Sequence, residues 1–302
     1  MNEIVFIDCT PELKALFDAG KLKAPEGTFI HFGDPTPEEI VSLCSNARIL
    51  LVEHTVIEAQ TLAACPNLKA IVFMGTGAST YIPLEWATLN NIAVSTTPGY
   101  GSTAVAEHAM ALTFAAARKI GPMVKDIKSG QWQPRGGMQL KGRKVAVIGF
   151  GEIGRCYAQM ACALGMTVSA WNRSPVDSPF FEPDLEQALS GAEIVSLHLA
   201  LNEATLGFLD TARLRLLKPG ALVINTARAA LIDQAALAGQ LESGHIAHAA
   251  LDVFWQEPIS VDDPWRDMEN VTLTAHAAYM TEEAYLELWK RTLKAVSQHT
   301  QA

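Results

Sequence analysis

The chain has 302 residues, of which 49% are hydrophobic and 18% charged, and its formal net charge is −9. This composition is typical of a compact globular protein, and the length suggests two domains. The acidic balance and the lack of long Lys/Arg runs argue against a nucleic-acid-binding surface or a polybasic membrane surface. No apolar run reaches the roughly 18 residues of a membrane-spanning helix. We therefore expect neither a nucleic acid nor a membrane as a partner.

The first apolar run, at 4–7, has no basic segment before it, which is unlike a signal peptide. The five cysteines are odd in number and include no CxxC pair. This usage favours reduced thiols in a cytosolic protein, so we expect a cytoplasmic location. The spacing of Cys and His residues matches no metal site, and no metal is expected.

Short runs rich in Val, Ile and Leu alternate with longer helical patterns along the chain. The predicted strands are 4–7, 49–52, 70–73, 93–95, 145–148, 167–170, 194–197, 222–225, 249–252 and 271–274. The predicted helices include 36–45, 103–119, 154–164, 184–189, 233–243 and 282–299. Nearly continuous apolar strands separated by helices are typical of parallel sheets that are covered on both faces. The predicted fold class is therefore α/β, with doubly wound parallel sheets.

The clearest division of the chain lies in the Thr-Pro-Gly-Tyr-Gly segment at 97–101. A long Ala-rich helical pattern follows it, and then a stretch rich in Gly, Pro and polar residues at 130–142. We interpret residues 1–100 as one α/β domain and residues 101–279 as a second.

The strongest local motif is a GxGxxG formed by Gly149, Gly151 and Gly154. It follows an apolar strand and opens a helix pattern, as a dinucleotide-binding loop requires. Gly149 allows a tight turn, Gly151 lets the backbone approach a pyrophosphate, and Gly154 lets the helix pack close to the strand. The helix N-terminus would offer its free N–H groups to the phosphates; an ordinary glycine-rich turn is the alternative. The predicted cofactor loop comprises Gly149, Phe150, Gly151, Glu152, Ile153 and Gly154.

The strand that follows this loop ends without the acidic residue that holds the ribose 2′-hydroxyl in NAD enzymes. Asn172, Arg173 and Ser174 stand there instead. Neutral donors and one cation suit a 2′-phosphate, so the sequence predicts a preference for NADP, with NAD as the other cofactor to consider. The alternative is that Arg173 is a solvated loop residue.

Three later segments place polar residues directly after predicted strands. They span 222–233, 250–258 and 273–281 and contain Arg228, Glu257 and His276 respectively. Open α/β sheets bind their ligands at the carboxyl ends of their strands. We therefore expect these side chains to belong to a functional site.

In this order and after this glycine-rich loop, the three segments resemble the D-isomer-specific 2-hydroxyacid dehydrogenases. The resemblance includes Gly75-Thr-Gly77, Ala106-Glu-His108 and the segment 196–205, and so covers nearly the whole chain. It implies a flavodoxin-like substrate-binding domain, made of residues 1–100 and completed by a C-terminal helix at 280–302. It also implies a Rossmann cofactor domain at 101–279 and a homodimer.

By motif match, the resemblance implies that Arg228 binds the substrate, that Glu257 is the carboxylate partner and that His276 is the acid/base. These residue types suit the reduction of a ketone by hydride, which needs a proton for the developing alkoxide. A carboxylate beside a histidine stabilises the charged ring and fixes its orientation. An arginine can grip the carboxylate of a 2-oxoacid in a two-point fork.

The resemblance also assigns cofactor contacts beyond the glycine-rich loop. Asp252 matches the residue that holds the nicotinamide carboxamide, and Thr226 and Ala227 lie in the cofactor-binding stretch before the arginine. The chain departs from the family pattern in two places. Ala229 replaces the glycine that commonly follows the arginine, which mildly constrains that turn, and the ribose acid is absent.

The segment Gly75-Thr76-Gly77 follows a predicted strand. Exposed backbone N–H groups there could form an anion-binding nest for the substrate carboxylate, and a simple strand-ending turn is the alternative. The leading hypothesis is an NADPH-dependent 2-oxoacid reductase that acts on glyoxylate, hydroxypyruvate or a bulkier relative. An NAD-dependent dehydrogenase working oxidatively and a cofactor-sensing binding protein are the alternatives.

Overall fold

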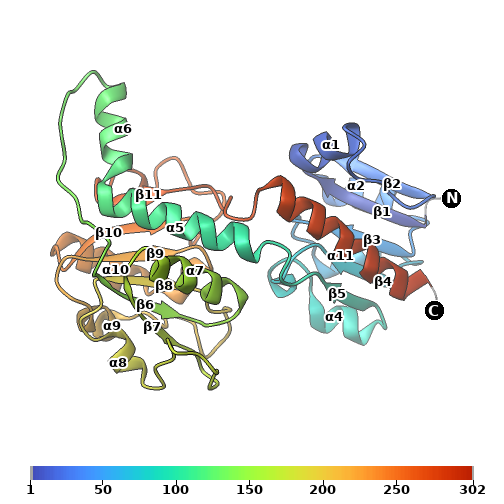
Figure 1. Cartoon of the computed structure of the whole chain (residues 1–302). Coiled ribbons are helices and arrows are strands. Elements are labelled where there is room, and N and C mark those ends of the chain that lie inside the picture. The colour runs from blue at the N-terminus through green and yellow to red at the C-terminus, as the bar shows by residue number, and fades with distance from the viewer. Residues whose placement is uncertain (1–2, 301–302) are drawn as a thin grey trace. The chain divides into compact units, whose positions relative to one another are not determined.

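A computed structural model describes residues 3–300, which divide into two compact units. The first unit runs to Gly101 and resumes at Met280, and the second is Ser102–Tyr279. Each unit is built on one sheet of parallel strands with helices on both faces (Figure 1). The predicted fold class is therefore confirmed.

The sheet of the first unit has five strands in the order β2-β1-β3-β4-β5, which is the flavodoxin-like order. The strands are β1 (Ile4–Cys9), β2 (Thr28–Phe32), β3 (Ile49–Val52), β4 (Ala70–Phe73) and β5 (Ala93–Thr96). Every residue of β1, β3 and β4 is buried, as expected for central strands of a sheet covered on both faces. The edge strand β2 is only half-buried, and the sequence analysis did not predict it.

The helices that cover this sheet are α1 (Pro11–Asp18), α2 (Pro37–Leu43), α3 (Ala59–Ala63), α4 (Leu84–Leu89) and α11 (Glu282–Thr300), with a short 3-10 turn η1 (Ala78–Thr80). Helix α11 brings the end of the chain back onto the first sheet, where Trp289 contacts the rings of Phe6 and Phe17. The indole N–H of Trp289 donates to the carbonyl oxygen of Lys23 at 3.0 Å. This unit is therefore discontinuous in sequence.

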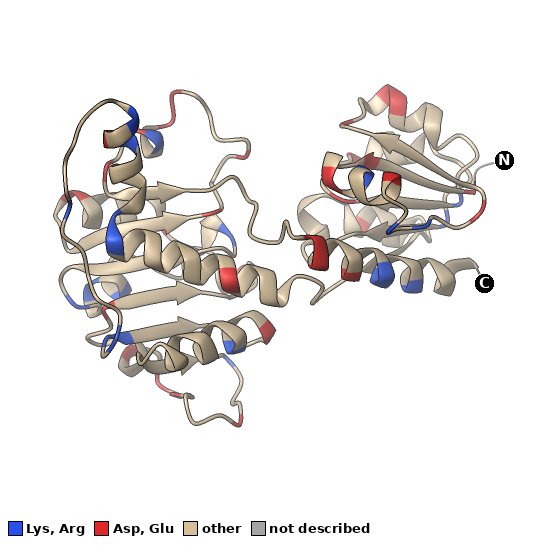
Figure 2. Ribbon diagram, turned by 45° about the horizontal axis from the view of Figure 1, so that its top comes forward, with Lys and Arg blue, Asp and Glu red and all other residues tan. Residues whose placement is uncertain are grey.

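Charges along α11 follow the polarity of the helix. Its first turn carries Glu282 and Glu283, and Lys290, Arg291 and Lys294 come later. Figure 2 shows this change from red to blue along the helix. Acidic groups near the N-terminus interact favourably with the helix dipole, so the sequence of α11 supports the helix locally as well as through packing.

The sheet of the second unit has six strands in the order β11-β10-β9-β8-β6-β7. The strands are β6 (Lys144–Ile148), β7 (Thr167–Trp171), β8 (Ile194–Leu197), β9 (Ala221–Asn225), β10 (Ile246–Leu251) and β11 (Val271–Leu273). Strand β6 pairs with β7 on one side and with β8 on the other, so the winding direction reverses at its carboxyl end. Such a switch point is where doubly wound sheets bind nucleotides.

Successive residues of these strands enter two different cores. Ile148 and Leu197 lie in the core that α8 (Leu185–Leu189), α9 (Thr211–Leu216) and α10 (Gln234–Glu242) cover. Val147 and Ile194 lie in the core beneath α5 (Ser102–Arg118) and α7 (Glu152–Ala163). Neighbouring side chains of a strand point to opposite faces, so two cores require the nearly continuous apolar strands that the sequence shows.

Helix α5 ends where Lys119 adopts a left-handed conformation with φ of 51°, and a separate helix α6 (Ile120–Lys128) follows. The sequence pattern predicts one helix at 103–119 and gives no sign of α6. The unit also contains two 3-10 turns, η2 (Ala229–Leu231) and η3 (Pro264–Arg266). Across the described residues 3–300, no helix has the length and apolar character needed to cross a membrane.

Candidate active site

The glycine-rich loop lies at the switch point of the second sheet, between β6 and α7. Gly149 has a φ of 97°, and a Cβ atom there would lie 2.5 Å from backbone atoms of His198. A Cβ atom on Gly154 would lie 2.0 Å from the carbonyl oxygen of Gly149. Both positions therefore need glycine, the first for its backbone conformation and the second for close packing.

Gly151 differs from the other two glycines because no atom lies within 4 Å of a Cβ built on it. It is the N-cap residue of α7, and no side chain caps the helix there. The first N–H groups of α7, on Glu152, Ile153 and Gly154, lack helical carbonyl partners, as at any helix start. An uncapped helix N-terminus next to a glycine with space around it can bind a pyrophosphate. The residues present therefore suit a dinucleotide.

Asn172 links the end of β7 to this loop. Its Oδ1 accepts the N–H of Phe150 at 3.2 Å, and its Nδ2 donates to the carbonyl oxygen of Ser174 at 3.0 Å. Arg173 and Ser174 are exposed. Within residues 3–300, Arg173 has no hydrogen bond or ion pair. Its cationic group is therefore free to meet an anion beside the loop.

The imidazole of His276 is held by Glu257. Oε2 of Glu257 lies 2.7 Å from Nδ1 of His276, and Oε1 accepts the N–H of Phe254 at 2.8 Å. Burial raises the pKa of Glu257, but the hydrogen bonds of His276 and Phe254 and the charge of Arg228 outweigh it, so this pKa lies below its ordinary value. The ionised carboxylate can only accept a hydrogen bond, so Nδ1 carries the hydrogen.

The other ring nitrogen of His276, Nε2, makes no hydrogen bond with the residues that the structure describes. The side chain of His276 is 29% exposed, so this nitrogen can reach a ligand. His276 also has a φ of 50°, a conformation uncommon for residues other than glycine. Its N–H donates to the carbonyl oxygen of Asp252 at 2.7 Å, which helps to hold that conformation.

The carboxylate of Asp252 is fully buried and binds the segment around His276. Oδ1 accepts the hydroxyl of Thr274 at 2.6 Å and the N–H of Ala277 at 3.0 Å, and Oδ2 accepts the N–H of Ala278 at 3.0 Å. Burial raises the pKa of Asp252, but the hydrogen bonds of His108, Thr274 and the two amides lower it to a net value below the ordinary one. Contact with a nicotinamide carboxamide stays a prediction for this residue.

Arg228 lies in the turn that follows β9, and the side chain of Asn225 fixes the backbone of this turn. Nδ2 of Asn225 donates to the carbonyl oxygen of Arg228 at 2.9 Å, and its Oδ1 accepts the N–H of Ala227 at 3.0 Å. The guanidinium donates from Nη1 to the carbonyl oxygen of Ala227 at 2.7 Å. Its charge helps to lower the pKa of Glu257, so the guanidinium lies within electrostatic reach of that carboxylate.

Two neighbours of Arg228 bear on the predicted cofactor stretch. The hydroxyl oxygen of Thr226 is buried and has no hydrogen-bond partner within the described part of the chain. Buried polar groups usually have a partner, so this hydroxyl is suited to bind a ligand. Ala229 is not among the residues with a positive φ. The turn therefore accepts alanine without strain, and the departure from glycine there carries no structural cost.

The segment Gly75-Thr76-Gly77 belongs to the first unit, whereas the residues described so far belong to the second. It follows β4, and a Cβ atom on Gly75 would lie 2.6 Å from the ring of Phe73. The carbonyl oxygen of Gly75 accepts the N–H of Thr97 at 3.0 Å, while Thr76 is exposed. Gly75 is buried and Gly77 is partly exposed, and the binding of a carboxylate by this segment stays a prediction.

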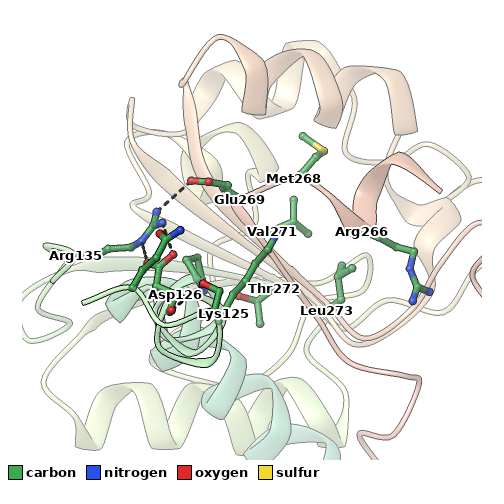
Figure 3. A pocket seen from close by; sticks show the side chains of 13 residues that line it. Lys125, Asp126, Arg135, Arg266, Met268, Glu269, Val271, Thr272 and Leu273 are labelled. Carbon is green, nitrogen blue, oxygen red and sulfur yellow. Dashed lines mark hydrogen bonds and ion pairs between the residues drawn. The ribbon is translucent and has the colours of Figure 1, made fainter. Parts of the chain in front are cut away.

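A pocket of about 360 Å³ lies elsewhere in the second unit, between α6 and the segment 266–273 (Figure 3). Arg135 points there toward Asp126 and Glu269, to which it donates at 2.7–3.1 Å and 3.2 Å respectively. None of the predicted site residues lines this pocket. Within the described residues, no group of three or more His, Cys, Asp or Glu side chains is arranged to hold a metal ion.

Sequence reasoning missed the hydrogen-bonding partners of the site. Asn225 orders the arginine turn, the N–H of Phe254 holds Glu257, and His108 and Thr274 reach Asp252. The only signal for His108 was its place in the Ala106-Glu-His108 motif, to which no role was attached. The others lie in loops or at a strand end, where the folding of the chain, rather than residue type, decides which groups they meet.

A family model described as "D-isomer specific 2-hydroxyacid dehydrogenase, NAD binding domain" matches residues 110–278. The chain belongs to the D-isomer specific 2-hydroxyacid dehydrogenase family. The resemblance deduced from the motifs is therefore confirmed, and the second unit contains the NAD binding domain of this family of dehydrogenases. The matched region includes the glycine-rich loop, Arg228, Glu257 and His276.

Relatives within the family bear several names. A glyoxylate reductase of Thermofilum pendens is 35% identical over 278 residues, which are 87% of this chain and 82% of the relative. A D-3-phosphoglycerate dehydrogenase of Archaeoglobus fulgidus is 33% identical over 80% of this chain. The chain spans about half the length of that relative and of similar D-3-phosphoglycerate dehydrogenases, at 47–48%.

Solved structures match both units of the chain. The TT0316 protein from Thermus thermophilus has a TM-score of 0.85 and 29% identity, with 99% of this chain and 96% of that chain covered. An acyclic imino acid reductase in complex with NADPH and D-Arg has a TM-score of 0.84 and 28% identity, with 99% and 97% covered. These matches confirm the two-unit α/β fold.

Proposed function

We propose that this chain reduces a 2-oxoacid to the 2-hydroxyacid with NADPH. The observation that carries the proposal is the 2.7 Å contact between Nδ1 of His276 and Oε2 of Glu257. The charge of Arg228 also helps to lower the pKa of Glu257. The bound cofactor supplies the hydride. The chain itself must then bind the carboxylate of the substrate, orient its carbonyl group and deliver a proton.

In the proposed mechanism His276 is the general acid. Glu257 fixes the ring through Nδ1, so Nε2 holds the proton that the developing alkoxide takes up. Arg228 binds the substrate carboxylate through its fork of N–H groups and polarises the carbonyl group. The N–H groups of Gly75, Thr76 and Gly77 are proposed as a second contact for the carboxylate.

The second unit is proposed to bind the nucleotide. In the second unit, the pyrophosphate would lie on Gly151 and the start of α7, and the adenosine 2′-phosphate on Asn172, Arg173 and Ser174. The exposed and unpaired guanidinium of Arg173 supports the choice of NADPH. Asp252, Thr226 and Ala227 remain proposed contacts of the nicotinamide end.

The substrate is proposed to be a small 2-oxoacid such as glyoxylate or hydroxypyruvate, or a bulkier one. The glyoxylate reductase of Thermofilum pendens supports this choice. So does a glycerate dehydrogenase of Methylorubrum extorquens, which is 33% identical over 82% of this chain. The five cysteines are free thiols, which fits a reducing compartment, and we propose a cytoplasmic location. Nothing in the proposal involves a nucleic acid or a membrane.

The assembly is proposed to be a homodimer. Helix α6 exposes Ile120, Val124 and Ile127, at 45%, 46% and 56% of their surface, and their spacing places them on one side of the helix. Trp132, which follows α6, is 87% exposed. An apolar face of this kind is typical of a protein–protein contact. A second copy of the chain is the proposed occupant, and sedimentation of wild type against Val124→Glu would test it.

The experiment that tests the function is a steady-state assay of NADPH and NADH oxidation with a panel of 2-oxoacids of increasing side-chain size. The proposal expects turnover that favours NADPH. Faster oxidation of 2-hydroxyacids with NAD would support an oxidative dehydrogenase instead. Tight cofactor binding without turnover of any acid would support a cofactor-sensing protein.

A further inference from the structure

His108 reaches the buried carboxylate of Asp252 from helix α5, which packs against β10 and β11. Nε2 of His108 lies 3.0 Å from the hydroxyl oxygen of Thr274 and 3.5 Å from Oδ1 of Asp252. The side chain of His108 is 26% exposed, whereas that of Asp252 is 0% exposed. Neither His108 nor Thr274 has a role in the mechanism proposed above.

The direction of these hydrogen bonds follows from the donors available. The hydroxyl of Thr274 has one hydrogen, and it is given to Oδ1 of Asp252 at 2.6 Å. The oxygen of Thr274 must therefore accept from His108, so Nε2 of His108 carries a hydrogen. The result is a chain of donors that runs from His108 through Thr274 to Asp252.

Asp252 also holds the backbone of His276 and of the two residues that follow it. Its carbonyl oxygen accepts the N–H of His276, and its carboxylate accepts the N–H groups of Ala277 and Ala278. His276 keeps a φ of 50° within this set of bonds. Such a conformation persists only where the surroundings over-determine it.

We propose that His108 is a positioning residue for proton transfer by His276. Through the hydroxyl of Thr274 it holds the Asp252 carboxylate, and Asp252 fixes the backbone that aims the imidazole. Glu257 fixes the same ring from its other side through Nδ1. A misplaced acid slows catalysis without weakening substrate binding to the same extent.

The test compares His108→Leu with His108→Gln. Leucine removes the donor, while the amide nitrogen of glutamine keeps a donor near the place of Nε2. For His108→Leu we expect kcat to fall about tenfold, the effect of losing one hydrogen bond in a buried network, with KM for the 2-oxoacid changed by less than about threefold. His108→Gln should keep most of kcat.

Thr274→Val provides a second variant in case His108→Leu does not fold. It keeps the shape of the side chain and breaks the same chain of donors. When His108→Leu and Thr274→Val are combined, their losses of kcat should not add, because each variant breaks the same link from His108 to Asp252. Fully additive losses, or an unchanged kcat in both single variants, would overturn the proposal.

His248→Leu is the matched control. Nε2 of His248 lies 2.8 Å from the hydroxyl of Thr272, so it is also a His–Thr pair between neighbouring segments of the second unit. His248 has no hydrogen bond to Asp252. This variant should lose stability but keep kcat within about twofold, since it leaves the backbone of His276 in place.

The kcat comparison rests on the proposed function, because it requires that the protein reduce a 2-oxoacid. A second measurement therefore does not use activity. Amide hydrogen exchange across residues 274–279 should be faster in His108→Leu and Thr274→Val than in wild type, His108→Gln or His248→Leu. Faster exchange without turnover of any 2-oxoacid by wild type would reject the proposed function alone. Unchanged exchange in both His108→Leu and Thr274→Val would reject the positioning role.

Discussion

Nδ1 of His276 lies 2.7 Å from Oε2 of Glu257, and Nε2 of the same ring has no partner among the described residues. Replacement of His276 by glutamine removes the proton donor while leaving a polar side chain of similar reach. We expect kcat to fall by about 10²–10⁴-fold, the usual contribution of general acid catalysis. Cofactor affinity, measured by NADPH fluorescence, should stay nearly unchanged. A variant that keeps more than half of the wild-type kcat would remove His276 from the mechanism.

Arg228→Lys tests whether the substrate carboxylate is held by a fork of two N–H groups. Lysine keeps the charge but offers a single point of contact. We expect a strong rise in KM for the best 2-oxoacid and a fall of kcat/KM by about tenfold or more. A 2-oxoacid amide should be a far poorer substrate than the free acid for the wild-type enzyme. Equal kcat/KM for acid and amide would show that no carboxylate is recognised.

The central strands and the site segments could be predicted because each has a local cause. Strands such as β6 and β9 are buried on both faces, so their sequences are nearly continuous apolar runs. The polar residues of the site follow directly after strands, as the topology of an open sheet requires. Gly149 and Gly154 could be assigned because glycine alone fits a left-handed turn and a backbone contact as close as theirs.

The elements that escaped prediction depend on contacts distant in sequence. Strand β2 lies at a sheet edge and is half-buried, so its pattern is weak. Helix α11 was predicted, but its place in the first unit followed only from the family resemblance, because no local pattern encodes the packing of Trp289 on Phe6 and Phe17. The hydrogen bond from His108 to Thr274 joins residues 166 positions apart. Residue type alone cannot identify such a pair.

Glu53 is a buried carboxyl group in the first unit, with 6% of its surface exposed. Burial and the nearby Asp8 raise the pKa of Glu53 to about 8. The folded state therefore binds a proton more tightly than the unfolded state, and stability is lost as pH rises from about 4.5 through 8. His54 acts in the same direction: burial lowers its pKa, but Asp8, Asp34 and Glu53 raise it to a net value above the ordinary one.

Glu53→Gln should remove the part of this pH dependence that comes from Glu53, because glutamine resembles the protonated acid. A pKa difference of one between folded and unfolded states is worth about 1.4 kcal/mol, so the gain at high pH is on the order of a few kcal/mol. The melting temperatures of variant and wild type should nearly agree below about pH 4.5, diverge progressively between about pH 4.5 and 8 with the variant more stable, and stay apart by a constant amount above pH 8. A difference that does not depend on pH would show that Glu53 is not protonated in the folded protein.

Arg173→Ala tests the cation beside the proposed 2′-phosphate. Arg173 is exposed and has no ion pair within residues 3–300, so its loss should leave the fold unchanged. Opposite charges about 4 Å apart near a protein surface attract by up to roughly 4 kcal/mol before desolvation. We expect kcat/KM for NADPH to fall by about tenfold or more, with that for NADH nearly constant. The loss should shrink at high salt. Equal losses with both cofactors would point to a general effect on the loop.

Asn172→Asp restores an acid at the ribose position. The structure indicates what the change preserves, because a carboxylate can still accept the N–H of Phe150 as Oδ1 of Asn172 does. The donor to the carbonyl oxygen of Ser174 is lost, so the turn at 172–174 should loosen slightly. A carboxylate repels a 2′-phosphate and accepts hydrogen bonds from the ribose hydroxyls of NADH.

Wild type should favour NADPH by about ten- to a thousandfold in kcat/KM, and Asn172→Asp should move this ratio toward NADH. The measurement is kcat/KM for both cofactors at saturating 2-oxoacid. A wild-type enzyme that favours NADH would make the assignment of this site wrong, and Arg173 would then be a solvated loop residue.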